Sequence, residues 1–327
     1  MRPVEKRLAR RLAFITDGMH PEIVTGLEHL SADAIDARLA GLKEQSNRIC
    51  FLISTTFADE IDADGSNRNK TIQPANWWRA TIARHFPNAV LFKGPEPDTA
   101  ICLTWKPGIA ARLIVGHERR RQSLIRRLER FRSTRFQRRY PPGNISEAEL
   151  STLLNGRAVA LVGNSRALFE HAYGSRIDAH DIVIRCNRAP IFHTRSHGAR
   201  TDWIATSAEI PETLPAIKGV SYILWMSPRR DRLPLWLLRF PKLFVNPAEN
   251  NHMLAAQIGA RPSTGMMVID LLVRSQCARI DLYGFDFFQS QSVSGNQTKS
   301  STPHDFDGEE ALVRAWADKD PRLVINR

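Results

Sequence analysis

The stretch Val159–Ala160–Leu161–Val162–Gly163–Asn164–Ser165 decides the fold class of this chain. A short apolar segment, 158–162, ends in a glycine and two small polar residues, and a helical pattern follows over 166–173. A buried strand that stops at a glycine and opens into a helix is the kind of turn at which α/β proteins bind nucleotides. A plain strand–helix turn also fits, because the stretch is not a GxGxxG fingerprint. Gly163, Asn164 and Ser165 are candidate ligand-binding residues.

The C-terminal half continues this alternation of strands and helices. Strand patterns cover 181–185, 201–205, 220–226, 242–245 and 279–283, and helical patterns cover 248–258 and 264–276. Alternation of this kind predicts a mostly parallel sheet. We therefore expect an α/β, Rossmann-like domain with helices on both faces of the sheet.

Composition supports a globular protein. The 327 residues are 43% hydrophobic and 24% charged, which excludes wholesale disorder. The four cysteines are too scattered for a disulfide scaffold or a CxxC zinc site. The most apolar run, 265–273, is far shorter than the roughly 20 residues of a transmembrane helix. We expect a cytosolic protein with reduced thiols.

The positive charge is concentrated in one segment. The net charge is +12, and the ten arginines and single glutamate between Arg119 and Arg139 supply +9 of it. Leu124, Leu128 and Phe131 recur there at helical spacing, which predicts a basic amphipathic helix over 116–140. A solvated surface helix, an anionic membrane surface or a polyanionic partner would each explain it. No nucleic-acid motif or aromatic stacking platform accompanies the arginines, so no nucleic acid is expected.

The first 115 residues carry no recognisable site. A helical pattern over 32–42 and an apolar strand over 48–54 indicate an α/β region of unknown role. Asp62 and Asp64 lie in the polar loop 58–71 and could hold a divalent metal, although such a pair is more often a solvated turn. We expect no metal site. The predicted organisation is thus 1–115, a basic helix 116–140 and a catalytic domain 150–327.

Two further segments resemble ligand sites. Asn187 follows the second strand of the predicted sheet, at the edge where Gly163 follows the first. A second candidate opens the most apolar helix of the chain. There Ser263 can cap the helix, and the free N–H groups behind it favour an anion. This segment contributes the candidates Arg261, Ser263, Thr264 and Gly265.

His304 and Glu309 form the third candidate. They follow the polar stretch 289–303, which we expect to be a mobile loop that closes over the site. A histidine there is either a solvated loop residue or, at the mouth of a nucleotide site, a general base near neutral pH.

Taken together, these motifs resemble the sialyltransferases of glycosyltransferase family 29. Gly163–Asn164–Ser165, Arg185-x-Asn187-x-Ala189–Pro190 and Gly198-x-Arg200–Thr201 are similar to the family's long motif. Asn246–Pro247, Pro262–Ser263–Thr264–Gly265, Cys277 and Tyr283–Gly284–Phe285 are similar to its short motif and the approach to it. His304 and Glu309 match its HxxxxE motif. The resemblance spans about residues 157–310.

The resemblance implies a single domain of glycosyltransferase-A type and an inverting transfer without a metal or other cofactor. The donor would be a CMP-linked sugar acid, sialic-acid- or Kdo-like, and the acceptor a glycan of lipopolysaccharide or capsule type. Asn164 and Asn187 would hold the CMP portion, and Ser263, Thr264 and Gly265 would line the donor pocket. His304 would be the base, and Glu309 would orient the loop that carries it.

The sequence departs from the family in three respects. The long-motif cysteine that usually pairs with the short-motif cysteine is replaced by Val159, while Cys277 remains. Val245 and Arg261 stand where tyrosines are usual, and the tyrosine-rich third motif is not recognisable in 289–303. The lost cysteine and the absence of an anchor favour a bacterial-type, cytoplasmic enzyme, peripheral at the inner membrane face.

The residues leave two rival functions open. One is a non-catalytic α/β protein that binds a nucleotide or polyanion, although such a module needs no His304/Glu309 pair. The other is a Rossmann enzyme that uses NAD or S-adenosylmethionine. It is disfavoured because the turn at Gly163 lacks the second glycine that lets a pyrophosphate approach.

Overall fold

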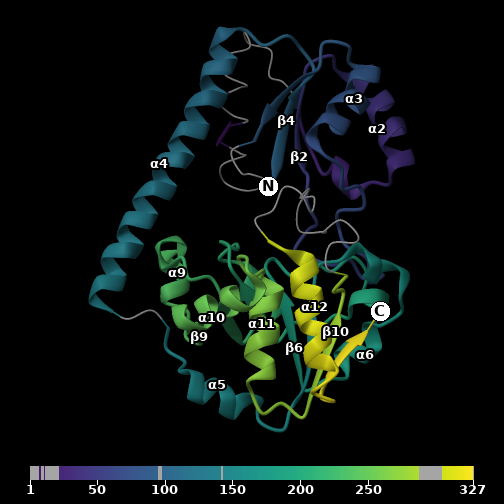
Figure 1. The fold of residues 1–327 in the computed structure, drawn as a ribbon. Coiled ribbons are helices and arrows are strands. Elements are labelled where there is room, and N and C mark those ends of the chain that lie inside the picture. Colours follow the sequence, from purple (N-terminus) through teal and green to yellow (C-terminus); the bar gives the residue numbers. More distant parts are fainter. Residues whose placement is uncertain are drawn as a thin grey trace. The chain divides into compact units, whose positions relative to one another are not determined.

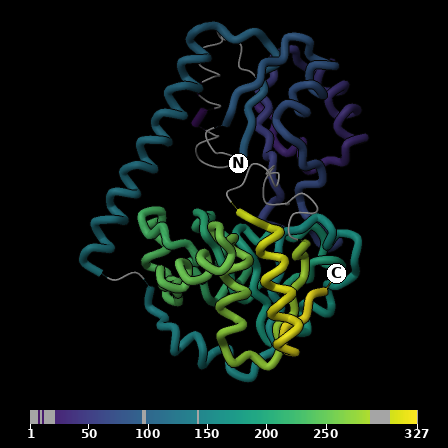
Figure 2. The backbone as a smooth tube through the Cα atoms, in the orientation of Figure 1, coloured from purple at the N-terminus to yellow at the C-terminus, as the bar shows by residue number. Residues whose placement is uncertain are grey.

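The computed structural model describes residues 7, 8, 11, 22–94, 98–140, 143–286 and 304–326. The chain divides into two compact units, which Figure 2 traces from the N-terminus to the C-terminus. The first comprises Met1–Ala58 and Arg68–Leu128, and the second comprises Asp59–Asn67 and Glu129–Arg327. The segment 289–303, expected to be a mobile loop, lies outside the described residues.

The second unit is built on a seven-stranded sheet in which all paired strands are parallel. Its order is β11-β10-β5-β6-β7-β8-β9. The strands are β5 (Ala158–Val162), β6 (Ile182–Cys186), β7 (Trp203–Thr206), β8 (Tyr222–Trp225), β9 (Leu243–Val245), β10 (Arg279–Tyr283) and β11 (Leu323–Asn326). The prediction of an α/β fold with a mostly parallel sheet is confirmed.

Helices cover both faces of this sheet because both faces are apolar (Figure 1). Val159 and Leu161 of β5 face one layer, and Ala160 and Val162 face the other. The first layer holds α5 (Glu147–Leu154), α10 (Ala248–Ile258), α11 (Thr264–Val273) and α12 (Phe306–Ala317). The second layer contains η2 (Arg166–Glu170), α6 (Gly174–Asp178), α8 (Leu214–Lys218) and α9 (Leu235–Leu238). Two further short helices are α7 (Thr194–His197) and η3 (Arg230–Arg232).

The helix expected over 166–173 is the clearest difference from the sequence-based expectation. A 3-10 turn replaces it, ends where His171 adopts an extended conformation, and α6 begins only at Gly174. A Cβ on Gly174 would lie 1.9 Å from the carbonyl oxygen of Thr194. The chain therefore turns here because two backbone segments pack against each other, which helical periodicity does not reveal.

The first unit has a mixed four-stranded sheet of order β1-β2-β4-β3. Its strands are β1 (Glu22–Thr25), β2 (Ile49–Ser54), β3 (Val90–Lys93) and β4 (Thr99–Leu103), and its helices are η1 (Leu27–His29), α2 (Ala32–Gln45) and α3 (Ala75–His85). The 31-residue helix α4 (Ile109–Arg139) contains the arginine-rich segment and contributes residues to both units. No described helix is both long enough and apolar enough to cross a membrane.

Candidate active site

The order of the parallel sheet places a candidate site at the ends of β5 and β10. Successive strands from β5 to β9 run outward in one direction, whereas β10 and β11 lie on the other side of β5. Open α/β sheets bind ligands at the carboxyl ends of the strands where the order reverses in this way. Gly163 N donates to the Tyr283 carbonyl at 2.8 Å, and Ser165 N donates to the Gly284 carbonyl at 3.2 Å. The two strand ends therefore form one rigid edge.

Phe285 joins the turn after β5 to the start of α11. A Cβ on Gly265 would lie 2.6 Å from Cε1 of Phe285, and a Cβ on Gly163 would lie 3.1 Å from Cε2 of the same ring. Because neither glycine has a side chain, the Phe285 ring can occupy the space beside both. Phe285 belongs to the Tyr283–Gly284–Phe285 motif but is not among the predicted site residues, because its position between two candidate glycines cannot be read from spacing.

Asn164 and Asn187 lie on the neighbouring ends of β5 and β6. Asn164 Nδ2 donates to the Cys186 carbonyl at 3.3 Å, directly before Asn187. Asn187 has a φ of 58°, a left-handed conformation that asparagine tolerates better than most residues. Its backbone N–H donates to the Ala205 carbonyl of β7 at 2.8 Å. The adjacent strand ends thus bring both predicted asparagines to one edge of the sheet.

Glu309 binds the residue that caps α11. Its carboxylate accepts the Ser263 backbone N–H at 2.6 Å and the Ser263 hydroxyl at 2.7 Å. Ser263 Oγ also accepts from Met266 N at 3.2 Å, so the predicted N-cap is present. Thr264 and Gly265 follow in the first turn of α11, where backbone N–H groups lack intrahelical acceptors. The Glu309 carboxylate thus contacts the start of α11.

Burial changes the ionisation of Glu309. The residue is only 2% exposed, and this desolvation raises the pKa of its carboxyl group to about 7. The hydrogen bonds from Ser263 favour the charged form but do not offset the effect of burial. The carboxyl group therefore titrates near neutral pH.

His304 lies beside Arg261, two residues before the cap Ser263. Its Nδ1 is 2.8 Å from the carbonyl oxygen of Arg261. A carbonyl only accepts, so Nδ1 carries the proton and a neutral ring has its lone pair on Nε2. Burial lowers the pKa of His304 below its ordinary value of 6.5, and the positive charge of Arg261 acts in the same direction. The imidazole is therefore neutral at pH 7.

A cavity of about 200 Å³ opens at the same edge of the sheet. Ser165, Gly284 and Phe285 line it from the ends of β5 and β10. The remaining lining residues include His171, Tyr173 and Asn326, none of which belongs to a predicted site motif. His171 and Tyr173 stack with their ring centroids 4.8 Å apart. His171 and Tyr173 lie between η2 and α6, whereas Asn326 lies in β11, so their juxtaposition is a tertiary property.

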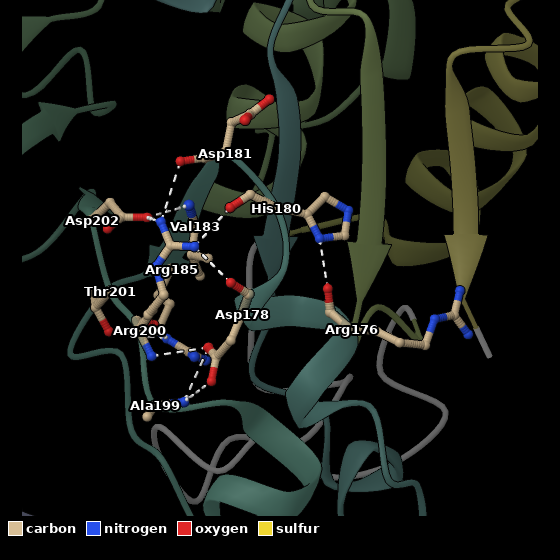
Figure 3. Close-up of polar contacts among 10 residues, drawn as sticks. All are labelled: Arg176, Asp178, His180, Asp181, Val183, Arg185, Ala199, Arg200, Thr201 and Asp202. Carbon is tan, nitrogen blue, oxygen red and sulfur yellow. Dashed lines mark hydrogen bonds and ion pairs between the residues drawn. The ribbon is translucent and has the colours of Figure 1, made fainter.

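The residues Gly198, Arg200 and Thr201 of the long-motif resemblance lie elsewhere. Arg200 donates to the carbonyls of Asp178 and His180 and to the Asp202 carboxylate at 2.6, 2.7 and 2.8 Å (Figure 3). Asp202 directly precedes β7, so this network joins the amino-terminal edge of the sheet, opposite the candidate site. The motif residues here hold the fold together.

Arg185 links this network to the sheet interior. Its side chain is fully buried. The guanidinium donates to the Arg200 carbonyl and the Thr201 hydroxyl (Figure 3), and also to the His197 carbonyl. Burial lowers the pKa of its guanidinium to about 10, so it remains charged at neutral pH. The arginine of the Arg-x-Asn motif is therefore structural, and only Asn187 lies at the site edge.

Asp62 and Asp64 form a turn rather than part of this site. Asp64 Oδ1 accepts from the Ser66 backbone N–H at 2.9 Å and from its hydroxyl at 2.6 Å. Gly65, with a φ of 80°, donates to the Asp62 carbonyl. Across the part of the chain that the structure describes, no group of three or more His, Cys, Asp or Glu residues could hold a metal ion.

A parallel α/β sheet with polar residues at its switch point is the architecture with which α/β proteins bind nucleotides. Within this class, residues 144–240 match the model of glycosyltransferase family 29 (sialyltransferase). The matched segment contains Gly163, Asn164, Ser165 and Asn187 of the candidate site. The chain is therefore sialyltransferase-like over this segment.

Two curated relatives and one solved structure are similar to the chain. The mouse CMP-N-acetylneuraminate-beta-galactosamide-alpha-2,3-sialyltransferase 1 is 44% identical over 173 residues, which are 45% of this chain and 50% of the mouse protein. Sialyltransferase-like protein 5 of rice is 31% identical over 131 residues, 38% of this chain and 26% of that protein. The chain thus spans half or less of these relatives. A crystal structure of a mammalian sialyltransferase in complex with Gal-beta-1-3GalNAc-ortho-nitrophenol covers 59% of this chain and 78% of its own, with 22% identity and a TM-score of 0.42.

Proposed function

We propose that this protein is an inverting, metal-independent glycosyltransferase. It moves a sialic-acid- or Kdo-like sugar from a CMP-linked donor to a glycan acceptor. One observation carries the proposal: His304 and Glu309, five residues apart, bind Arg261 and Ser263 at the start of α11. The start of α11 in turn contacts the switch point of the sheet through Phe285.

The donor phosphate would be held without a metal. CMP is a monophosphate leaving group, so no diphosphate charge requires a divalent cation. The first turn of α11 offers backbone N–H groups from Thr264 and Gly265 and the positive end of a 10-residue helix. Asn164 and Asn187 at the strand ends would hold the remainder of CMP, and Arg261 would add positive charge near the phosphate.

In the transfer step, His304 takes up the proton of the acceptor hydroxyl. Nε2 of the neutral imidazole removes the proton from an acceptor hydroxyl, whose oxygen bonds to the anomeric carbon. The bond between that carbon and the phosphate oxygen breaks, CMP leaves with the electron pair, and the anomeric configuration inverts. The lowered pKa of His304 supports this role because the ring is deprotonated at neutral pH. Glu309 acts as a positioning residue through Ser263.

The acceptor and the compartment extend the same proposal. All four cysteines are buried free thiols, and Cys277 Sγ lies 3.0 Å from the Ser275 hydroxyl. Free thiols support a reducing compartment. We therefore place the enzyme in the cytoplasm, as a bacterial-type sialyltransferase acting on a lipopolysaccharide or capsule-type glycan.

Ligand-dependent thermal unfolding tests the proposal. CMP in EDTA should raise the melting temperature, because a ligand that binds only the native state stabilises it. NAD and S-adenosylhomocysteine should have no such effect. Stabilisation that appears only after addition of magnesium or manganese would contradict metal independence. CMP binding with no transfer from CMP-sialic acid to any glycan acceptor would favour a non-catalytic nucleotide-binding protein.

A further inference from the structure

Helix α4 has two opposite faces of different character. Successive residues of an α-helix are rotated by about 100°, which places Ala111, Val115, Gln122 and Ser133 within an arc of about 40°. All four are buried. This side of α4 is therefore packed against the protein at these four positions.

The opposite face of α4 exposes large apolar side chains. Leu113, Leu124, Leu128 and Phe131 are 66, 57, 51 and 66% exposed. They fall within an arc of about 60°, centred opposite the buried side. We call these four residues the apolar stripe. Four large apolar side chains exposed on one side of a single helix mark an interaction surface rather than the scattered apolar residues that any protein surface shows.

Exposed arginines flank the apolar stripe. By the same rotation, Arg120 and Arg127 lie on one flank of it and Arg139 lies on the other, while Arg135 lies within its arc. Between Arg119 and Arg139, Glu129 is the single acidic residue beside ten arginines. A partner must therefore accept apolar side chains and neutralise several cations at the same surface.

We propose that this face of α4 docks on an anionic lipid bilayer, with the apolar stripe in the acyl boundary and the arginines among the headgroups. This chemistry is that of helices that lie in the plane of a membrane interface. A nucleic acid would bind the arginines but has no use for four exposed apolar side chains. A second copy of the chain would cover the apolar stripe but would set like charges against each other.

Vesicle co-sedimentation of the full-length protein tests the proposal. We expect binding to phosphatidylcholine vesicles that contain about one-third phosphatidylserine, and none to phosphatidylcholine alone. Binding should be strong at an ionic strength of about 0.1 M and weak at about 1 M, because the Debye length falls from about 10 to about 3 Å. The variant Leu124→Gln/Leu128→Gln/Phe131→Gln should bind at least about tenfold more weakly. Arg120→Gln/Arg127→Gln/Arg135→Gln should lose about 100-fold.

Matched exposed arginines on other elements provide the control. Arg38→Gln/Arg79→Gln/Arg239→Gln removes the same charge and should retain at least half of the parental binding. The melting temperature, with and without CMP, verifies that each variant is folded. Four results would overturn the proposal: no binding by the parent protein at low salt, undiminished binding by the variant of the apolar stripe, equal loss in the control, or retention by heparin or DNA without vesicle binding. A dimer in solution that the Leu124→Gln/Leu128→Gln/Phe131→Gln variant abolishes would identify a second copy instead.

Discussion

Glu309 and Ser263 form a two-point contact: one carboxylate accepts both the backbone N–H and the hydroxyl of the same serine, at 2.6 and 2.7 Å. The Ser263 hydroxyl also caps α11 by accepting from Met266 N. The first turns of α11 and α12 are therefore joined through one side chain. Any ligand held by the start of α11 depends on this contact for its position.

The stability of the protein should depend on pH through Glu309. Because burial raises the carboxyl pKa from 4.5 to about 7, its stabilising contribution is full below pH 4.5 and is lost as the pH rises to about 7. Glu309→Gln lacks this titration. Relative to the parent, the variant's free energy of unfolding should rise by up to about 1.4 kcal/mol per pH unit in this window and then level off. Urea unfolding at several pH values measures the difference, and a flat difference would contradict the assignment.

His304→Ala should strongly reduce transfer but leave CMP binding intact. The loss should be about 10²–10⁴-fold in kcat, as is typical of a positioned general base. Because burial lowers the pKa of His304, the parental rate should fall only below pH 6.5, and this limb should be missing from the residual activity of the variant. Transfer assays with CMP-sialic acid and thermal shifts with CMP measure the two properties. His252→Ala, at an exposed position of α10, should match the parent.

A His304→Ala enzyme with near-parental turnover would remove His304 from the mechanism. Loss of CMP binding together with activity would instead make it a donor ligand.

Gly265→Ala should weaken CMP binding because the new Cβ would lie 2.6 Å from the Phe285 ring and displace it. Overpacking of this kind typically costs about 1–3 kcal/mol of stability. Gly41→Ala in α2 is the matched control, since no atom lies within 4 Å of its Cβ position. The control should be stabilised by about 0.5–1 kcal/mol through helix propensity. Urea unfolding and CMP titration test both variants, and unchanged CMP affinity in Gly265→Ala would exclude Phe285 from the site.

Asp281→Asn should destabilise the second unit by about 1.5–3 kcal/mol, the value of hydrogen bonds to a charged group. Burial would raise the pKa of this carboxyl, but hydrogen bonds from His180, Arg279 and Asn326 lower it well below 3.8. The contribution should therefore persist above pH 3.8 and be lost only in stronger acid. Asp231→Asn breaks the exposed pair with Arg229 and should cost at most about 1 kcal/mol. Equal effects in urea unfolding would contradict the role of burial.

The sequence determined the class of the fold because strand and helix patterns are local. The apolar run 158–162 and the helical pattern 248–258 correspond to β5 and α10 without a shift of boundary. The N-cap at Ser263 could also be predicted, since a capping serine before an apolar helix needs only its own neighbours. The prediction of a helix over 166–173 was wrong. The close contact between Gly174 and the Thr194 carbonyl of α7 overrides the local helix propensity there.

Only the tertiary structure decided which candidates meet. Gly163 and Gly265 are separated by about a hundred residues, yet both leave room for one ring, that of Phe285. Conversely, Arg200 and Asn187 are near in the sequence but lie at opposite edges of the sheet. Asn187 follows β6 and Arg200 precedes β7, and these two strands are parallel. Residue types and spacing identify chemistry that one segment can carry. Burial, which raises the pKa of Glu309 and lowers that of His304, depends on what the rest of the chain packs around them.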